Sequence, residues 1–121
     1  MKTNYKFTDT ESNDALREYA DEKITSFEKL LDEQAAAAAV CDVEFKRDTH
    51  HQSGDVCYAE ITLETDGKLH RVSKAEPTFE KAIDKVKDDM LASLREDKGK
   101  VEDSIRRGGR EAKEMLQEGG L

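Results

Sequence analysis

The feature that most constrains this chain is the change in spacing of its apolar residues along the sequence. Residues 2–8, 37–47 and 56–65 alternate between apolar and polar side chains, as half-buried β-strands do. Two longer segments repeat apolar residues at intervals of three and four, which is typical of amphipathic helices. These segments run from Leu16 to Leu31 and from Phe79 to Leu94. A chain that mixes the two periods in this order is an α+β protein.

A tight turn adds a fourth strand. The dipeptide Asp66-Gly67 directly follows the third alternating segment and is the strongest hairpin signal in the chain. We therefore expect residues 68–74 to return as a strand antiparallel to the one before. Which face of this strand points to the core stays open, because Leu69 and Val72 have opposite parity.

The alanine run from Ala35 to Ala39 is compatible with two structures. Alanine favours a helix, but alternation resumes at once. One side of that alternation holds Ala39, Cys41, Val43 and Phe45, and the other holds Asp42, Glu44 and Lys46. We therefore predict a strand over residues 37–47.

Capping residues mark the ends of the two helices. Ser12 or Asn13 can serve as the N-cap of the first helix. Pro77 suits the first position of the second helix, Thr78 suits its cap, and Gly99 suits its end.

The predicted order is β-α-β-β-β-α. A right-handed crossover through the first helix makes the first two strands parallel, and the last three strands form an antiparallel meander. The result is one four-stranded sheet with both helices packed on one face and the other face exposed to water. We assign residues 1–98 to this domain. Residues 99–121 form a C-terminal tail, flexible or partly helical, because Gly108-Gly109 interrupts its helical period.

The charge balance argues against one class of function. The 121 residues include 28 acidic and 20 basic side chains, for a net charge of −8. A generic nucleic-acid binder that works by bulk positive charge is therefore excluded. A local basic face is not excluded. The tail is electrically balanced, so the acidic excess belongs to residues 1–98.

Targeting signals are absent from the sequence. The longest uncharged run, Gln34 to Cys41, is eight residues long, far short of the roughly 20 that span a bilayer. The N-terminus lacks the apolar stretch of a signal peptide. Two cysteines in this context are expected to be reduced thiols of a cytoplasmic protein.

No motif indicates an enzyme, a metal site or a bound cofactor. His50 and His51 are adjacent in a polar loop, and Cys57 follows six residues later, which is not a metal-ligand spacing. Cys41 and Cys57 fall on inward strand faces, where cysteine behaves as a small apolar residue. An enzyme that uses His50, His51 or His70 would need a pocket that brings the histidine to a carboxylate or thiol.

Surface charge is the remaining candidate for function. Arg17, Lys23 and Lys29 project from the outer side of the first helix, among several acidic residues. Lys81 and Lys85 are one turn apart on the second helix. Arg95 and Lys98 lie together in its last turn, where cations also suit the helix dipole. Mixed charge of this kind is by itself typical of a solvated helix face.

Two motifs, taken with the order of elements, indicate a family. The first is Ala15-Leu16-Arg17-Glu18-Tyr19 followed by Lys23, and the second is Leu69-His70-Arg71-Val72 leading to Ala82-Ile83-Asp84. Over residues 1–98 the chain resembles the ribosome hibernation promoting factors, also called ribosome-associated inhibitors or sigma-54 modulation proteins. It is similar to their short form, because 23 residues after Lys98 are too few for the second, dimer-forming domain of long members.

The resemblance implies a double-stranded-RNA-binding-domain-like fold and a function without chemistry. Family members occupy the channel of the small ribosomal subunit where messenger and transfer RNA bind, and so silence idle ribosomes in stationary phase or stress. The implied partners are 16S-type ribosomal RNA and neighbouring ribosomal proteins, with no membrane and no small-molecule substrate. The free protein is expected to be monomeric.

The RNA-binding residues follow position by position from this resemblance. Arg17, Lys23, Arg71, Arg95 and Lys98 match basic positions of the family, and Lys29, Lys81 and Lys85 add to them. Ser26, Asp89 and Ala92 stand where many members have basic residues, and the Asp89 carboxylate on the second helix opposes phosphate binding. The alternative is an acidic protein-interaction module of the same fold that has lost ribosome binding.

Overall fold

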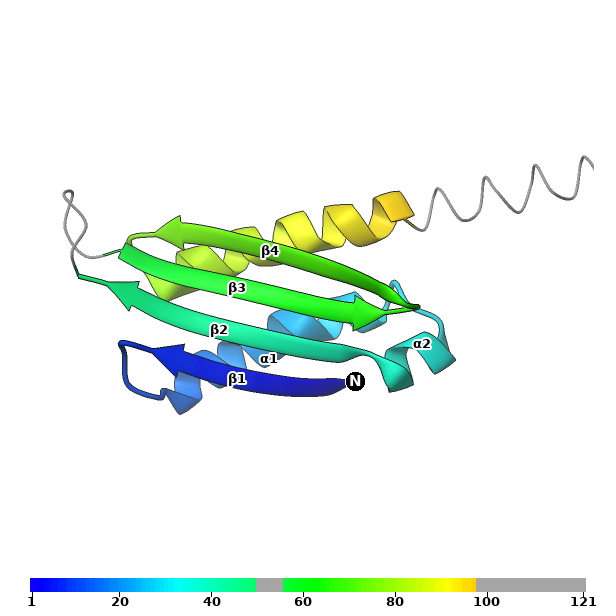
Figure 1. Ribbon diagram of the computed structural model, residues 1–121, viewed down its shortest axis with the longest axis horizontal. Coiled ribbons are helices and arrows are strands. Elements are labelled where there is room, and N and C mark those ends of the chain that lie inside the picture. The colour runs from blue at the N-terminus through cyan, green and yellow to red at the C-terminus, as the bar shows by residue number, and fades with distance from the viewer. Residues whose placement is uncertain (50–55, 98–121) are drawn as a thin grey trace, which may run out of the picture.

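Four strands form one mixed sheet in the order β1-β2-β3-β4, as the computed structural model shows (Figure 1). The strands are β1 (Lys2–Thr8), β2 (Val40–Asp48), β3 (Val56–Thr65) and β4 (Lys68–Glu76). β1 pairs with β2 in parallel, and the other two pairs are antiparallel. The structure describes residues 1–49 and 56–97. The predicted crossover and meander are both confirmed.

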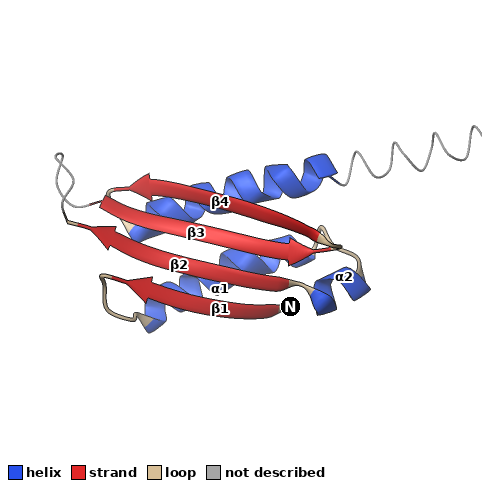
Figure 2. Ribbon diagram, in the orientation of Figure 1, coloured by secondary structure: helices blue, strands red, loops and turns tan. Residues whose placement is uncertain are grey.

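Two long helices cover one face of this sheet, and a short third helix lies at its end (Figure 2). They are α1 (Asp14–Glu28), the short α2 (Glu33–Ala38) and a long helix over residues 79–97. α1 lies behind β1 and β2, and the 79–97 helix lies behind β4 (Figure 1). The α+β fold and the placement of both long helices on one face therefore match the prediction. In the part of the chain that is described, no helix has the length and apolarity to cross a bilayer.

The core lies between the sheet and the two long helices. Its largest fully buried side chains come from every layer: Phe27 from α1, Phe45 from β2, Ile61 from β3, and Ile83 and Met90 from the 79–97 helix. Burial of such side chains removes apolar surface from water and is the main force that joins helices to sheet. Within residues 1–49 and 56–97, no helix covers the opposite face of the sheet.

The alanine run is a helix, so the predicted start of the second strand is wrong. Asp32 caps α2, and its carboxylate accepts a hydrogen bond from the Ala35 N–H at 2.7 Å. With a cap present, the helix propensity of alanine prevails over its apolar alternation. β2 therefore begins at Val40 rather than at 37, and it continues to Asp48. The predicted inward residues of this strand, Cys41 among them, are buried.

The register of the β3–β4 hairpin shows which face of β4 points to the core. Val72 pairs with Ile61, whereas Leu69 pairs with Glu64. Residues opposite each other in an antiparallel pair point to the same face, so Val72 faces the core and Leu69 is 62% exposed. The strand also runs two residues further than predicted, to Glu76.

The helix boundaries differ from the prediction at two places. Asn13 is the N-cap of α1, as one of the two alternatives proposed, but α1 ends at Glu28 instead of Leu31. Leu30 and Leu31 follow in a tighter turn. At the second helix Pro77 precedes the cap, and the Thr78 hydroxyl accepts from the Lys81 N–H at 3.2 Å. Gly99 and the predicted tail lie outside the described residues.

Candidate nucleic-acid interface

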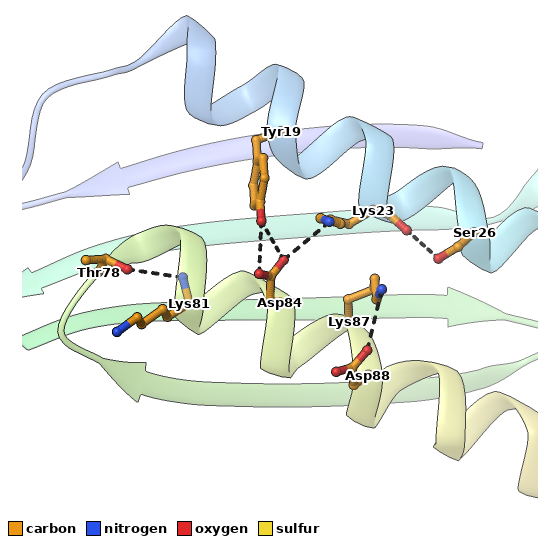
Figure 3. Close-up of polar contacts among 8 residues, drawn as sticks. All are labelled: Tyr19, Lys23, Ser26, Thr78, Lys81, Asp84, Lys87 and Asp88. Carbon is orange, nitrogen blue, oxygen red and sulfur yellow. Dashed lines mark hydrogen bonds and ion pairs between the residues drawn. The ribbon is translucent and has the colours of Figure 1, made fainter.

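Tyr19, Lys23 and Asp84 join the two long helices (Figure 3). Tyr19 and Lys23 project from α1, and Asp84 projects toward them from the 79–97 helix. The Tyr19 hydroxyl lies 2.8 and 2.9 Å from the two Asp84 carboxylate oxygens, and the Lys23 ammonium lies 3.4 Å from Oδ1. The ammonium is also 4.7 Å from the centre of the Tyr19 ring. We call these three residues the interhelix cluster.

The interhelix cluster changes the acid–base behaviour of two of its members. The hydrogen bond to Asp84 raises the pKa of the Tyr19 hydroxyl, and partial burial and the Asp84 charge act in the same direction. Burial works to lower the pKa of Lys23, but the attraction of Asp84, Tyr19 and Glu22 together outweighs it, so that this pKa is raised. Lys23 is therefore held as a cation, and its charge is already matched by a carboxylate.

Arg17 lies on the other flank of α1. Its guanidinium carbon is 5.7 Å from the centre of the Tyr5 ring and 5.5 Å from that of Phe7, both on β1. Its Nη2 donates to the Ser12 hydroxyl at 3.2 Å. No described carboxylate forms an ion pair with Arg17. The aromatic rings thus hold the cation without neutralising it.

A row of polar contacts ties the 79–97 helix to β4. Lys74 pairs with Asp89 at 2.8 Å, and Lys85 pairs with Glu76. Further along, the His70 imidazole contacts Ser93 at 3.2 Å through Nδ1 and Asp97 at 3.3 Å through Nε2, and Lys68 lies 3.6 Å from Asp97. The helix partners recur every fourth residue, which places them on one flank.

These contacts alter the expectation for two residues. Asp89 was expected to oppose phosphates, but Lys74 neutralises it. Lys85 was expected to meet phosphates, but Glu76 holds it. Asp89 and Lys85 therefore both help to hold the 79–97 helix against β4.

Arg71 is separated from the other predicted site residues. It pairs across the sheet with Thr62, which lies on the face opposite to the helices. On that open face its Nε lies 3.7 Å from Glu60. Arg71 therefore lies on a different face of the domain from the cations of the two long helices.

Three of the predicted cations are exposed, and a fourth, Arg17, is half-buried. Within residues 1–49 and 56–97 no carboxylate forms an ion pair with Arg17, Lys29, Lys81 or Arg95. Lys29 is at the C-cap of α1, and Lys81 and Arg95 are exposed on the 79–97 helix. Lys98 lies outside the described residues. Helical spacing placed Lys29, Lys81 and Arg95 on outer faces, whereas Arg17 is half-buried against the aromatic rings of β1. Spacing could not show which carboxylates lie nearby.

None of the aromatic–cation contacts was predicted from the sequence. Tyr19 and Lys23 are four residues apart, a spacing that places them on one helix face and offered a signal. Arg47 lies 5.8 Å from the Phe79 ring centre, and no local pattern links residues so far apart in the chain.

The chemistry of the described residues offers no reactive group in a catalytic arrangement. Cys41 and Cys57 are both free and buried, and burial raises the pKa of the Cys41 thiol to about 12. His70 is already engaged by Ser93 and Asp97. His50 and His51 lie outside the described residues. Over the described ranges, no three His, Cys, Asp or Glu side chains gather as metal ligands.

Known proteins are similar to this chain over most of its length. A family model described as Sigma 54 modulation protein / S30EA ribosomal protein matches residues 3–102. The Protein Y N-terminal domain from Thermus thermophilus has a similar fold, with a TM-score of 0.67 and 21% identity, covering 79% of this chain and 98% of that one. A ribosomal subunit interface protein from Coxiella burnetii gives a TM-score of 0.66 and 12% identity, covering 82% and 99%. No curated protein matches by sequence.

Proposed function

The chain belongs to the Sigma 54 modulation protein / S30EA ribosomal protein family, and from that premise we propose that it is a ribosome hibernation factor. In this proposal it binds the small ribosomal subunit in the channel for messenger and transfer RNA. Occupancy of that channel silences idle ribosomes in the cytoplasm under stress. The protein acts by binding, without catalysis.

The observation that carries this proposal is a set of cations on the two long helices that form no ion pair with a described carboxylate. Lys29, Lys81 and Arg95 are exposed and Arg17 is half-buried, in a chain whose net charge is −8. Phosphate groups interact strongly with such side chains, and arginine also offers paired N–H donors to them. Contacts to the phosphate backbone position a protein on RNA without reading its sequence.

The structure refines which residues we assign to the RNA. Arg17, Lys29, Lys81 and Arg95 are the proposed phosphate contacts, and Lys98 would extend them. Lys23 and Lys85 have structural partners and would contribute mainly through packing. We assign residues 1–98 to ribosome binding and treat residues 99–121 as an accessory tail.

Co-sedimentation with purified ribosomal particles tests the proposal. The full chain should sediment with small subunits and with 70S particles at low salt. Binding should weaken steeply as salt rises, because each phosphate contact releases counterions. A protein that stays at the top of the gradient at low salt would contradict the proposal.

A second candidate function rests on the open sheet face. Asp42, Glu60 and Glu64 lie on that face, as their register shows, and suit a basic protein partner. In that case charge reversal of the exposed Glu64 would abolish partner binding, whereas reversal of Arg17 would leave it unchanged. Ribosome binding by the wild-type chain that depends on Arg17 would exclude this alternative.

A further inference from the structure

A cavity opens at the end of the helical layer, where α1 meets the β3–β4 turn. Its volume is about 390 Å³, within the roughly 300–1,000 Å³ typical of small-ligand sites. Leu30 and Leu31 from the turn after α1 and Leu94 from the 79–97 helix provide apolar walls. Thr65, at the end of β3, also lines it. We call this the Thr65 cavity.

Thr65 is the unusual member of this cavity. Its side chain lies on the helix face of the sheet, on the same side as Leu63, and the residue is only 6% exposed. Its hydroxyl is buried and has no hydrogen-bond partner. Buried polar groups are nearly always hydrogen-bonded, because leaving one unpaired costs about 1–3 kcal/mol. A bound group that exchanges a hydrogen bond with Thr65 would recover that cost.

The charges around the cavity restrict what can enter it. On its wall, Asp97 is matched by His70 at 3.3 Å and by Lys68 at 3.6 Å. The buried part of a ligand therefore meets mainly the leucine walls, the Thr65 hydroxyl and the His70–Asp97 pair, and it should itself be neutral. Three further exposed charged residues line the cavity: Lys29, with which no described carboxylate pairs, Asp32, whose carboxylate caps α2, and Asp66 in the turn. An anionic group is therefore favoured at Lys29, on the outer side of a neutral group inside.

We propose that the Thr65 cavity binds a nucleobase, with the attached phosphate at Lys29. A base has apolar faces for the leucine walls and a polar edge for the Thr65 hydroxyl, which can donate or accept. Proteins recognise RNA largely through such unstacked bases. In its RNA form this inference rests on the proposed function, and it adds a base-recognising site to a surface otherwise assigned to phosphates. A free nucleotide presents the same chemistry.

Asp66 is expected to make the site prefer bases that carry an amino group. It is exposed in the turn after Thr65 and lines the same cavity. A carboxylate accepts hydrogen bonds from exocyclic amino groups, as aspartate does from cytosine. Adenine, cytosine and guanine should therefore bind better than uracil, which has no amino group.

Nuclear magnetic resonance titration of the full chain tests the site directly. The probes are the four nucleoside monophosphates, with ribose 5-phosphate as the ligand that lacks a base. Signals of Thr65, Leu31 and Leu94 should shift with the monophosphates and stay in place with ribose 5-phosphate. Equal shifts with ribose 5-phosphate, or no shift with any monophosphate at millimolar concentration, would overturn the inference.

Thr65→Val removes the hydroxyl with little change of shape. It should weaken monophosphate binding about 3–10-fold, the value of one hydrogen bond, without lowering the melting temperature, because the hydroxyl has no partner in the free protein. Thr65→Ser should restore binding. Thr62→Val is the matched control, since it makes the same change on the open face of the same strand. Equal binding by the two valine variants would contradict the assignment.

Ribosome co-sedimentation separates the two sources of the base. If RNA supplies it, Thr65→Val weakens small-subunit binding by a similar factor; if a free nucleotide supplies it, small-subunit binding is unchanged while monophosphate binding falls. Wild-type protein that binds monophosphates but not ribosomes would overturn the proposed function alone. Wild-type protein that binds ribosomes but no monophosphate would overturn the nucleobase site alone.

Discussion

The two flanks of α1 each carry a cation. The two cations look equivalent in the sequence, but in the folded protein only one of them has a carboxylate partner among the described residues. Arg17 lies over the aromatic rings of Tyr5 and Phe7, where no described carboxylate pairs with it. Lys23 lies in the interhelix cluster, 3.4 Å from Asp84. A polyanion can bind Arg17 directly, whereas it must compete with Asp84 for Lys23. The number of cations on a helix therefore overstates the charge available to RNA.

The largest difference should come from reversing the charge of Arg17. Arg17→Glu removes a phosphate contact and adds repulsion, so small-subunit affinity should fall on the order of 100-fold. Co-sedimentation at fixed, low salt measures this. Arg71→Glu is the matched control, because it makes the same change on the open face, where Arg71 pairs with Glu60. If both variants bind equally well or equally poorly, the helical side is not the binding surface.

A smaller effect is expected on stability from the opposite flank. Asp84→Ala leaves Tyr19 without its acceptor and Lys23 without its carboxylate. The free energy of unfolding should fall by about 1–2 kcal/mol, the range of one or two partly exposed hydrogen bonds. Urea denaturation measures the change. Arg17→Gln, on the flank without an ion pair, loses its cation–π contacts and should cost about 0.5–1 kcal/mol, and a loss larger than that of Asp84→Ala would break the comparison.

The smallest effect should appear in the dependence of stability on pH. The pKa values of Tyr19 and Lys23 are both raised in the folded state, so the folded chain holds these protons more tightly than the unfolded chain does. Their contribution is complete below the unfolded values, about 10 for tyrosine and 10.4 for lysine. It is lost as the pH rises through the folded values.

Melting temperatures recorded between neutral and strongly alkaline pH test this sign. Tyr19→Phe should flatten part of the alkaline decline, since it removes one of the two titrating groups. Tyr5 also has a raised pKa, because it is partly buried and donates a hydrogen bond to Asp21. Tyr5→Phe therefore measures how much of the alkaline decline in melting temperature comes from the Arg17 flank. An alkaline decline unchanged in Tyr19→Phe would contradict a role for the interhelix cluster.

Local patterns in the sequence were sufficient for most of the fold. Alternation identified the buried face of β2 and β3, and Asp66-Gly67 identified the last hairpin. The pattern failed where two local tendencies conflicted, as in the alanine run that forms α2. The pattern also left undecided which face of β4 points to the core, because only pairing with β3 shows that Val72, and not Leu69, faces it.

Local sequence patterns predicted less of the candidate site than of the fold. Helical period placed Lys29, Lys81 and Arg95 on outer surfaces, but it could not pair Lys85 with Glu76 or Lys23 with Asp84. Those partners lie on other elements, and ion pairs depend on distances of a few ångströms that only packing defines. The unpaired hydroxyl of Thr65 is equally invisible in the sequence, where the residue simply ends an alternating strand.

The amino-acid sequence by itself determined the order of elements, the buried faces of the central strands and the family resemblance, because periodicity and motifs are local properties. The tertiary structure alone decided which charges are available. Electrostatic attraction and hydrogen bonding act across the contacts between helices and sheet, so they neutralise Asp89 and hold Lys23. The same packing leaves Arg17 half-buried without an ion pair to a described carboxylate, and it leaves the Thr65 hydroxyl without a hydrogen-bond partner.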